Sequence, residues 1–158
     1  IVEYMMTTYY GAYGANLNKQ EMHVRCPAAS PVERINLVDR MLVFKGVADM
    51  IANPGKTTPI GVYAITESCE RALDQYESYP SLYNKEYLDV RLSRGLSQIM
   101  IYVMNDRYDF GKPANQYFEI IQQGYDDWSM EHTTLYVALR HSIKHDQGGS
   151  YRSPRWEE

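Results

Sequence analysis

Tyr10-Gly11-Ala12-Tyr13-Gly14-Ala15-Asn16-Leu17 is the stretch that decides the predicted fold of this chain. Thr7 to Tyr13 is rich in Thr and Tyr, as strands are, and glycine and asparagine then break that strand abruptly. Because Gly and Asn tolerate backbone conformations that other residues avoid, the break predicts a tight turn with several N–H groups facing one way. Such a turn can hold an anion or a carbonyl oxygen, although a plain strand-ending loop has the same signature.

Length and composition predict one globular domain. The chain has 158 residues, of which 44% are apolar and 23% charged. A chain of this length and composition can bury a hydrophobic core without disulfide bonds or structural metal ions. Its formal net charge of −4, with no basic stripe, argues against a nucleic-acid partner. No apolar run approaches the length of a membrane span, so no membrane partner is expected either.

The two cysteines, Cys26 and Cys69, are too few for a disulfide scaffold. Residues 1–8 lack the positively charged start and long apolar centre of a signal peptide. Together these features predict a cytoplasmic protein. Cys26 and His23 are three residues apart and suggest a thiol nucleophile, but a buried structural cysteine is the commoner case.

Short apolar runs separated by charged residues, Gly or Pro predict six or seven β-strands. They lie at 7–13, 35–38, 41–44, 47–51, 60–65, 87–92 and 98–104. Asn53-Pro54-Gly55 predicts a turn between two of them. Residues 105–114 are rich in turn formers and predict a loop.

Capping residues and amphipathic spacing predict the helices. They are a helix over 18–24, one over 67–76 capped by Thr66, one from Tyr117 that stops at Gly124, and one that ends near His145. The predicted fold class is therefore α+β, with helices packed against a sheet or barrel, in a single domain over 1–145. From 146 the composition turns to Gly, Ser, Pro and charge, which predicts a C-terminal tail over 146–158.

Tyrosine content and one glutamate suggest a polar cavity. The chain has 15 tyrosines, which supply apolar area and hydroxyl groups but serve equally well as ordinary packing. Glu77 follows a predicted helix among Tyr76, Tyr79 and Tyr83, where desolvation would raise its pKa toward that of a useful proton carrier. From the pattern alone, a solvated loop carboxylate is the plainer interpretation of Glu77.

His141 and His145 are spaced to share a helix face, with Asp146 beside them, so a metal site is conceivable. The glutamate of the zinc-protease helix pattern is missing between them, and solvated histidines are the preferred interpretation. We therefore expect no metal and no organic cofactor.

Four segments, in this order, resemble the gamma-glutamylcyclotransferase-like (AIG2-like) family. They are Tyr13-Gly14-Ala15-Asn16-Leu17, Arg25-Cys26-Pro27-Ala28, Gly61-Val62-Tyr63-Ala64-Ile65-Thr66, and Leu73-Asp74-Gln75-Tyr76-Glu77-Ser78-Tyr79-Pro80 followed by Tyr83. The resemblance runs from Thr7 to Leu139 and thus covers most of the chain. Its most informative parts are the Tyr-Gly-x-Asn-Leu turn and the Leu-Asp-x-Tyr-Glu block.

The resemblance implies a small mixed β-barrel of about six or seven strands flanked by helices, with a cavity at one end. It implies that the turn holds a γ-glutamyl group through backbone amides and that Glu77 is the general acid/base. The substrate-binding residues that it implies are Tyr13, Gly14, Ala15, Asn16, Leu17 and Tyr83. Ala15 stands where Ser is common in the family, so a backbone contact is expected there but no hydroxyl contact.

The function implied by the resemblance is cyclisation of a γ-glutamyl amide to 5-oxoproline with release of the amine. The expected partner is a small-molecule γ-glutamyl substrate, either a γ-glutamyl amino acid or a γ-glutamylamine, and the chain is expected to be a monomer or a homodimer. Two other functions stay open: a non-catalytic relative that binds a small ligand in the same cavity, and an interaction module with a Tyr-rich face.

Overall fold

Strand β1 (Thr8–Ala12) is the middle strand of a five-stranded sheet in the computed structural model, which describes residues 7–156. The strand order is β2-β3-β1-β5-β4. The other strands are β2 (Ser30–Phe44), β3 (Ala48–Ile65), β4 (Tyr83–Leu92) and β5 (Gly95–Met104). β1 pairs with β3 in antiparallel fashion along its whole length, but its parallel pairing with β5 is confined to Tyr9 and Tyr10.

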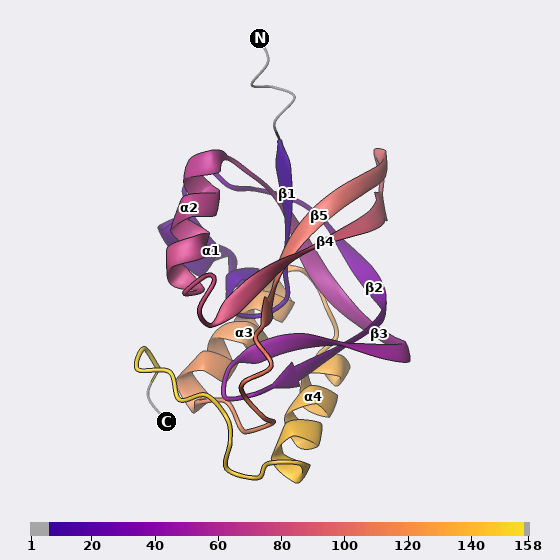
Figure 1. Ribbon diagram of the computed structural model, residues 1–158. Helices are drawn as coiled ribbons and strands as arrows, with labels where there is room; N and C mark the ends of the chain where they lie inside the picture. Colours follow the sequence, from indigo (N-terminus) through magenta and orange to yellow (C-terminus); the bar gives the residue numbers. More distant parts are fainter. Residues whose placement is uncertain (1–6, 157–158) are drawn as a thin grey trace.

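The α+β class is confirmed, and the sheet is curled rather than closed into a barrel (Figure 1). The described part of the chain has five strands and not six or seven. The number differs because the short apolar runs between residues 30 and 65 belong to two long strands, β2 and β3, of 15 and 18 residues. The strands predicted at 87–92 and 98–104 are confirmed as parts of β4 and β5.

The turn predicted at Asn53-Pro54-Gly55 is a bulge within β3. The β2–β3 ladder shifts its register between Val38 and Arg40, opposite this segment. Asp39 has a φ of 60°, and its Oδ1 accepts a hydrogen bond from the Gly55 N–H at 2.9 Å. The carboxylate thus satisfies a backbone donor that the bulge leaves without a ladder partner.

Helices cover one face and one end of the sheet (Figure 1). They are the 3₁₀ turn η2 (Ala15–Leu17) and the α-helices α1 (Lys19–Arg25), α2 (Glu67–Tyr76), α3 (Asn115–Asp127) and α4 (Thr133–Lys144). The predicted cap Thr66 is confirmed, because its hydroxyl accepts from the Cys69 N–H at 3.2 Å. Asn18 caps α1 in the same way, through the Glu21 N–H at 3.0 Å. No helix among residues 7–156 is long and apolar enough to cross a membrane.

The predicted stop at Gly124 is wrong, since α3 continues to Asp127. Glycine is required there for space. A Cβ at Gly124 would lie 2.7 Å from the Asn18 nitrogen and 2.7 Å from the Leu17 Cβ. The residue therefore lets α3 pack directly on η2, the turn that follows β1.

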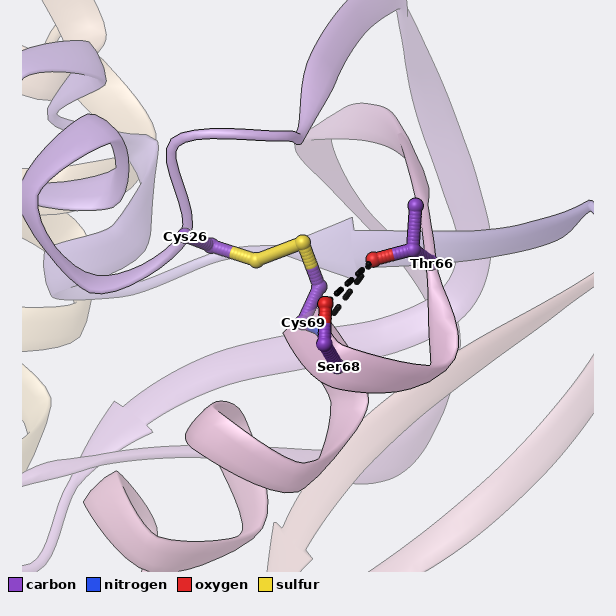
Figure 2. The surroundings of a disulfide bond; sticks show 4 residues. All are labelled: Cys26, Thr66, Ser68 and Cys69. Carbon is purple, nitrogen blue, oxygen red and sulfur yellow. Dashed lines mark hydrogen bonds between the residues drawn. A yellow bond between two sulfur atoms is a disulfide. The ribbon is translucent and has the colours of Figure 1, made fainter.

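Cys26 and Cys69 are joined by a disulfide (Figure 2). Cys26 follows α1, and Cys69 lies in the first turn of α2, beside the cap residue Thr66, whose hydroxyl is also hydrogen-bonded to that of Ser68 (Figure 2). Cys26 is therefore not a thiol nucleophile paired with His23. The reduced cysteines that we expected for a cytoplasmic protein are also absent from the described residues.

Two predictions fall partly outside the described residues. Most of the 1–8 stretch, in which we looked for a signal peptide, lies in residues 1–6, and the predicted tail over 146–158 includes residues 157–158.

Reduction of the disulfide is expected to lower the free energy of unfolding. The cross-link joins residues 43 apart, and a loop of this length restricts the unfolded chain by about 3 to 4 kcal/mol. Urea unfolding of the wild type with and without dithiothreitol measures this difference. The double variant Cys26→Ala/Cys69→Ala is the control, and its midpoint should not respond to dithiothreitol. Equal midpoints for oxidised and reduced wild type would contradict the expectation.

Candidate active site

The turn after β1 begins at Gly14, where a side chain would be tightly confined. The Leu17 N–H donates to the Gly14 carbonyl at 3.0 Å and closes the 3₁₀ turn η2. The φ of Gly14 is negative, −119°. A Cβ on Gly14 would lie 3.2 Å from the Ala48 Cβ and 3.3 Å from the Tyr117 hydroxyl. The first N–H groups of such a helical turn have no partner within the turn, so they are free to bind a ligand.

Asn16 anchors the turn from within the core, with 3% of its surface exposed. Its side-chain Nδ2 donates to the Tyr10 hydroxyl at 3.0 Å, and its main-chain carbonyl accepts from the Tyr63 hydroxyl at 2.9 Å. Its Oδ1 is buried and has no hydrogen-bond partner among residues 7–156. A buried acceptor without a partner is costly, and this one belongs to a residue that lines a cavity. Its capacity to accept a hydrogen bond is therefore not used within residues 7–156.

A cavity of about 130 Å³ lies beside the turn. This volume is well below the roughly 300 to 1,000 Å³ of pockets for drug-sized ligands, so it suits a small polar group. Seven tyrosines line it: Tyr10, Tyr13, Tyr76, Tyr83, Tyr102, Tyr117 and Tyr151. The tyrosine-lined cavity suggested by the composition is therefore present.

Glu77 lines the same cavity and ends α2. Its backbone N–H donates to the Leu73 carbonyl at 2.8 Å, which completes the last turn of the helix. Burial raises the pKa of the Glu77 carboxyl from 4.5 to about 7, and the positive charges of Arg25 and Arg155 limit the rise. Glu77 can therefore both accept and donate a proton near neutral pH.

Both of these cations pack against the ring of Tyr76. The guanidinium of Arg25 lies 3.6 Å from the centroid of the Tyr76 ring, and that of Arg155 lies 4.1 Å from it. Arg25 is already paired, because its Nη2 lies 2.9 Å from Oε1 of Glu21. Burial raises the pKa of Tyr76 to about 12, so its hydroxyl stays neutral at physiological pH.

The other tyrosine hydroxyls connect the walls of the cavity. Tyr83 donates to the Ala48 carbonyl at 2.6 Å, and the Ala48 N–H donates to the Tyr117 hydroxyl at 2.9 Å. Tyr13 donates to the Tyr102 carbonyl. Burial raises the pKa of Tyr13, Tyr83 and Tyr117 well above its ordinary value. These groups therefore stay neutral, and Glu77 is the cavity-lining group with a pKa near neutrality.

Ion pairs hold α2 against the sheet and thereby position Glu77. Lys85 of β4 lies 2.7 Å from a carboxylate oxygen of Glu70 and 3.0 Å from one of Asp74. The Tyr102 hydroxyl donates to the same Asp74 carboxylate at 2.6 Å. Since Asp74 is one helical turn before Glu77, these bonds fix the end of the helix that carries Glu77.

Six of the seven predicted site residues line the cavity: Tyr13, Gly14, Ala15, Asn16, Glu77 and Tyr83. Leu17 does not. It is completely buried in the core, and its carbonyl accepts from the Trp128 indole N–H at 2.8 Å. The roles given to these residues stay predictions.

Several lining residues were not predicted from the sequence. Tyr10, Tyr102 and Tyr117 come from β1, β5 and α3, and the high tyrosine content was the only signal for them. The segment 151–156 was expected as part of a tail, and nothing in its composition pointed to the cavity that it lines.

His141 and His145 lie together at the end of α4, with ring centroids 4.5 Å apart. No group of three or more His, Cys, Asp or Glu side chains suited to a metal ion occurs within residues 7–156. The two histidines thus lack a third such ligand in the described part of the chain.

Comparison with known proteins identifies relatives of this fold. The family model described as gamma-glutamyl cyclotransferase, AIG2-like, matches residues 10–130. A solved structure titled gamma-glutamyl cyclotransferase has a TM-score of 0.73 and 23% identity, with 94% of this chain and 95% of that chain covered. The uncharacterized protein loc79017 from Homo sapiens has a TM-score of 0.71, 23% identity and the same coverage, 94% and 95%.

YkqA from Bacillus subtilis has a TM-score of 0.72 and 22% identity, over 90% of this chain and 56% of that chain. At these identities the solved structures establish a shared fold. No curated protein sequence matches the chain significantly.

The raised pKa of Glu77 predicts that Glu77→Gln stabilises the protein at alkaline pH. Below 4.5 the carboxyl is protonated in both states, but above about 7 the folded state must hold a desolvated carboxylate. The wild type therefore loses stability relative to the variant as pH rises from 4.5 to 7, by about 2 kcal/mol because Glu77 is only partly buried from solvent. Urea unfolding of both proteins at pH 4.5 and 8 measures this; a variant less stable at pH 8 would contradict it.

Proposed function

Because this chain belongs to the gamma-glutamyl cyclotransferase, AIG2-like family, we propose that it is an enzyme that cyclises a γ-glutamyl amide to 5-oxoproline and releases the amine. The substrate is a γ-glutamyl amino acid or a γ-glutamylamine. Glu77 is the general acid/base, and Tyr13, Gly14, Ala15, Asn16 and Tyr83 bind the substrate.

One observation carries this proposal. Glu77, with a pKa near 7, lines the same small cavity as the turn formed by residues 13–16. A proton carrier and a set of backbone N–H groups are the two components that cyclisation of an amide requires. The neutral tyrosine hydroxyls around them supply no competing acid or base at neutral pH.

The first step forms a carbon–nitrogen bond within the substrate. The Glu77 carboxylate takes a proton from the substrate α-ammonium, and the resulting amine attacks the γ-carbonyl carbon. Both atoms belong to one molecule, so the enzyme needs no nucleophile of its own and mainly enforces the reactive rotamer. The unpartnered Oδ1 of Asn16 is an acceptor suited to an N–H of the substrate ammonium.

The second step breaks the original amide bond. The tetrahedral intermediate carries a negative oxygen, which backbone N–H groups of residues 14–16 would stabilise. The attacking nitrogen still carries two protons and releases one of them to solvent. Glu77 returns the first proton to the departing nitrogen, the carbon–nitrogen bond breaks, and 5-oxoproline and a neutral amine leave. Glu77 ends as a carboxylate, so the cycle closes without a cofactor. General acid/base catalysis of this kind contributes about 10² to 10⁴ in rate.

The Cys26–Cys69 disulfide bears on the compartment in which the reaction takes place. A cytoplasmic location, expected from the sequence, stays a prediction, and the Cys26–Cys69 disulfide weighs against it because disulfides persist mainly in oxidising compartments. The expected partner is a small-molecule γ-glutamyl substrate. The expected oligomeric state is a monomer or a homodimer.

Wild-type protein is expected to release 5-oxoproline from at least one of γ-glutamyl-alanine, γ-glutamyl-ε-lysine and glutathione. Glu77→Gln is expected to lower kcat by roughly 10²- to 10⁴-fold, because it removes the proton carrier but keeps the shape of the side chain. The readout is 5-oxoproline measured by chromatography. Glu131→Gln, an exposed carboxylate just before α4, is the matched control and should retain wild-type activity.

Two outcomes of this experiment contradict parts of the proposal. Equal turnover by wild type and Glu77→Gln would remove Glu77 from the mechanism. Tight binding of these compounds without turnover by the wild type would favour the non-catalytic ligand-binding function.

The pH profile of kcat/KM should follow the ionisation of Glu77. A protonated carboxyl cannot accept the proton of the substrate ammonium, so activity requires the carboxylate form. We expect kcat/KM to fall about tenfold per pH unit below a pH of about 7 and to level off above it. Initial rates between pH 5 and 8 test this, with circular dichroism at each pH to verify folding. A flat profile would contradict the assignment.

A further inference from the structure

The segment 146–156 leaves α4 and runs back across the molecule to the cavity. Figure 1 shows it in yellow, passing α3 on its way toward the end of α2. It is held along this path by main-chain hydrogen bonds, from the Asp109 N–H to the Gly149 carbonyl at 3.0 Å and from the Tyr151 N–H to the Lys45 carbonyl at 2.9 Å. The end of this segment therefore has a defined place in the structure.

Two side chains fix that end against the walls of the cavity. The Trp156 ring lies 5.3 Å from the ring of Tyr117 in α3. Nη1 of Arg155 donates to the Tyr76 carbonyl at 3.3 Å, next to Glu77 in the chain. Both residues line the cavity, and Arg155 is also exposed to solvent, so it lies where the cavity opens.

Arg155 makes no ion pair with another residue of the described range 7–156. Among the residues that line the cavity, Glu77 and Arg155 are the two with charged side chains. Glu21 pairs with the neighbouring Arg25, but no carboxylate within residues 7–156 pairs with Arg155. A guanidinium with free donors at a cavity opening is suited to a carboxylate of a ligand.

We propose that Arg155 is a specificity residue that binds the carboxylate of the departing amino acid, so that the preferred substrates are γ-glutamyl α-amino acids rather than γ-glutamylamines. This inference rests on the proposed function. With the γ-glutamyl group at the turn, Glu77 faces the departing nitrogen, and Arg155 is the cation at the opening beside it. In an α-amino acid the carboxylate is two bonds from that nitrogen and comes within reach of Arg155. A simple amine has no group to pair with it.

The residue lies outside the segment that matches the family model, which ends at residue 130. Any specificity that it confers therefore comes from outside the matched segment.

The test compares two substrates that differ only in charge, γ-glutamyl-alanine and γ-glutamyl-alaninamide. Wild-type protein is expected to favour γ-glutamyl-alanine by about tenfold in kcat/KM, since the amide cannot form the charge-assisted bond. In Arg155→Met this ratio should fall to about one, and Arg155→Lys should recover part of it. Any effect of Arg155 on Glu77 acts on both substrates alike and cancels in the ratio.

Arg152→Met is the matched control, because Arg152 is an exposed arginine of the same segment that does not line this cavity. It should keep the wild-type ratio. A wild-type ratio near one, or equal ratios in Arg155→Met and wild type, would overturn the inference and leave the proposed function intact.

Calorimetric binding of the same two compounds to Glu77→Gln separates this inference from the proposed function. If no protein turns over either compound but binding to Glu77→Gln favours γ-glutamyl-alanine and loses that preference when Arg155→Met is added, the role of Arg155 stands and the proposed reaction fails. If neither compound binds or reacts, both are overturned.

Discussion

Close packing of the turn after β1 against the last helices is the constraint on which the rest of the structure depends. Two glycines make it possible. A Cβ on Gly124 would meet Leu17, and a Cβ on Gly61 would lie 2.6 Å from Cε2 of Trp128. With both positions bare, Trp128 reaches across and its indole N–H holds the Leu17 carbonyl. The turn is thereby held against α3 and Trp128, and residues 13–16 line the cavity.

Most groups that line the cavity stabilise the folded protein, but Glu77 destabilises it when ionised. Neutral tyrosines bury apolar area while their hydroxyls bond to backbone groups or to the side chains of Asn16 and Asp74, so this wall contributes to stability. Glu77 lowers stability when ionised, because its carboxylate is desolvated and Arg25, one of the two cations that act on it, is paired with Glu21. The ion pair between Asp74 of α2 and Lys85 of β4 holds the helix on the sheet and offsets part of this destabilisation. A titratable group that lowers folding stability because it is desolvated is common in functional sites.

Local sequence signals predicted the elements whose structure is set locally. The cap at Thr66, the helix that follows it and the turn at Gly14 depend on residues a few positions apart, and they were found where expected. Features set by distant residues were not predictable in this way. The merging of short apolar runs into β2 and β3, the need for space at Gly124, the Cys26–Cys69 bond and the return of residues 151–156 to the cavity all depend on partners that a single sequence does not reveal.

The sheet consists of two separately paired halves that meet along a short seam. β2, β3 and β1 form one antiparallel half and β4 with β5 forms the other, while β1 and β5 share only the ladder at Tyr9 and Tyr10. The cavity straddles this seam, because the Tyr13 and Tyr83 hydroxyls donate across it. A sub-global opening there would leave both halves folded and yet dismantle the site. Because hydrogen bonds from the Tyr13 and Tyr83 hydroxyls cross the seam, the site persists only as long as the two halves stay together.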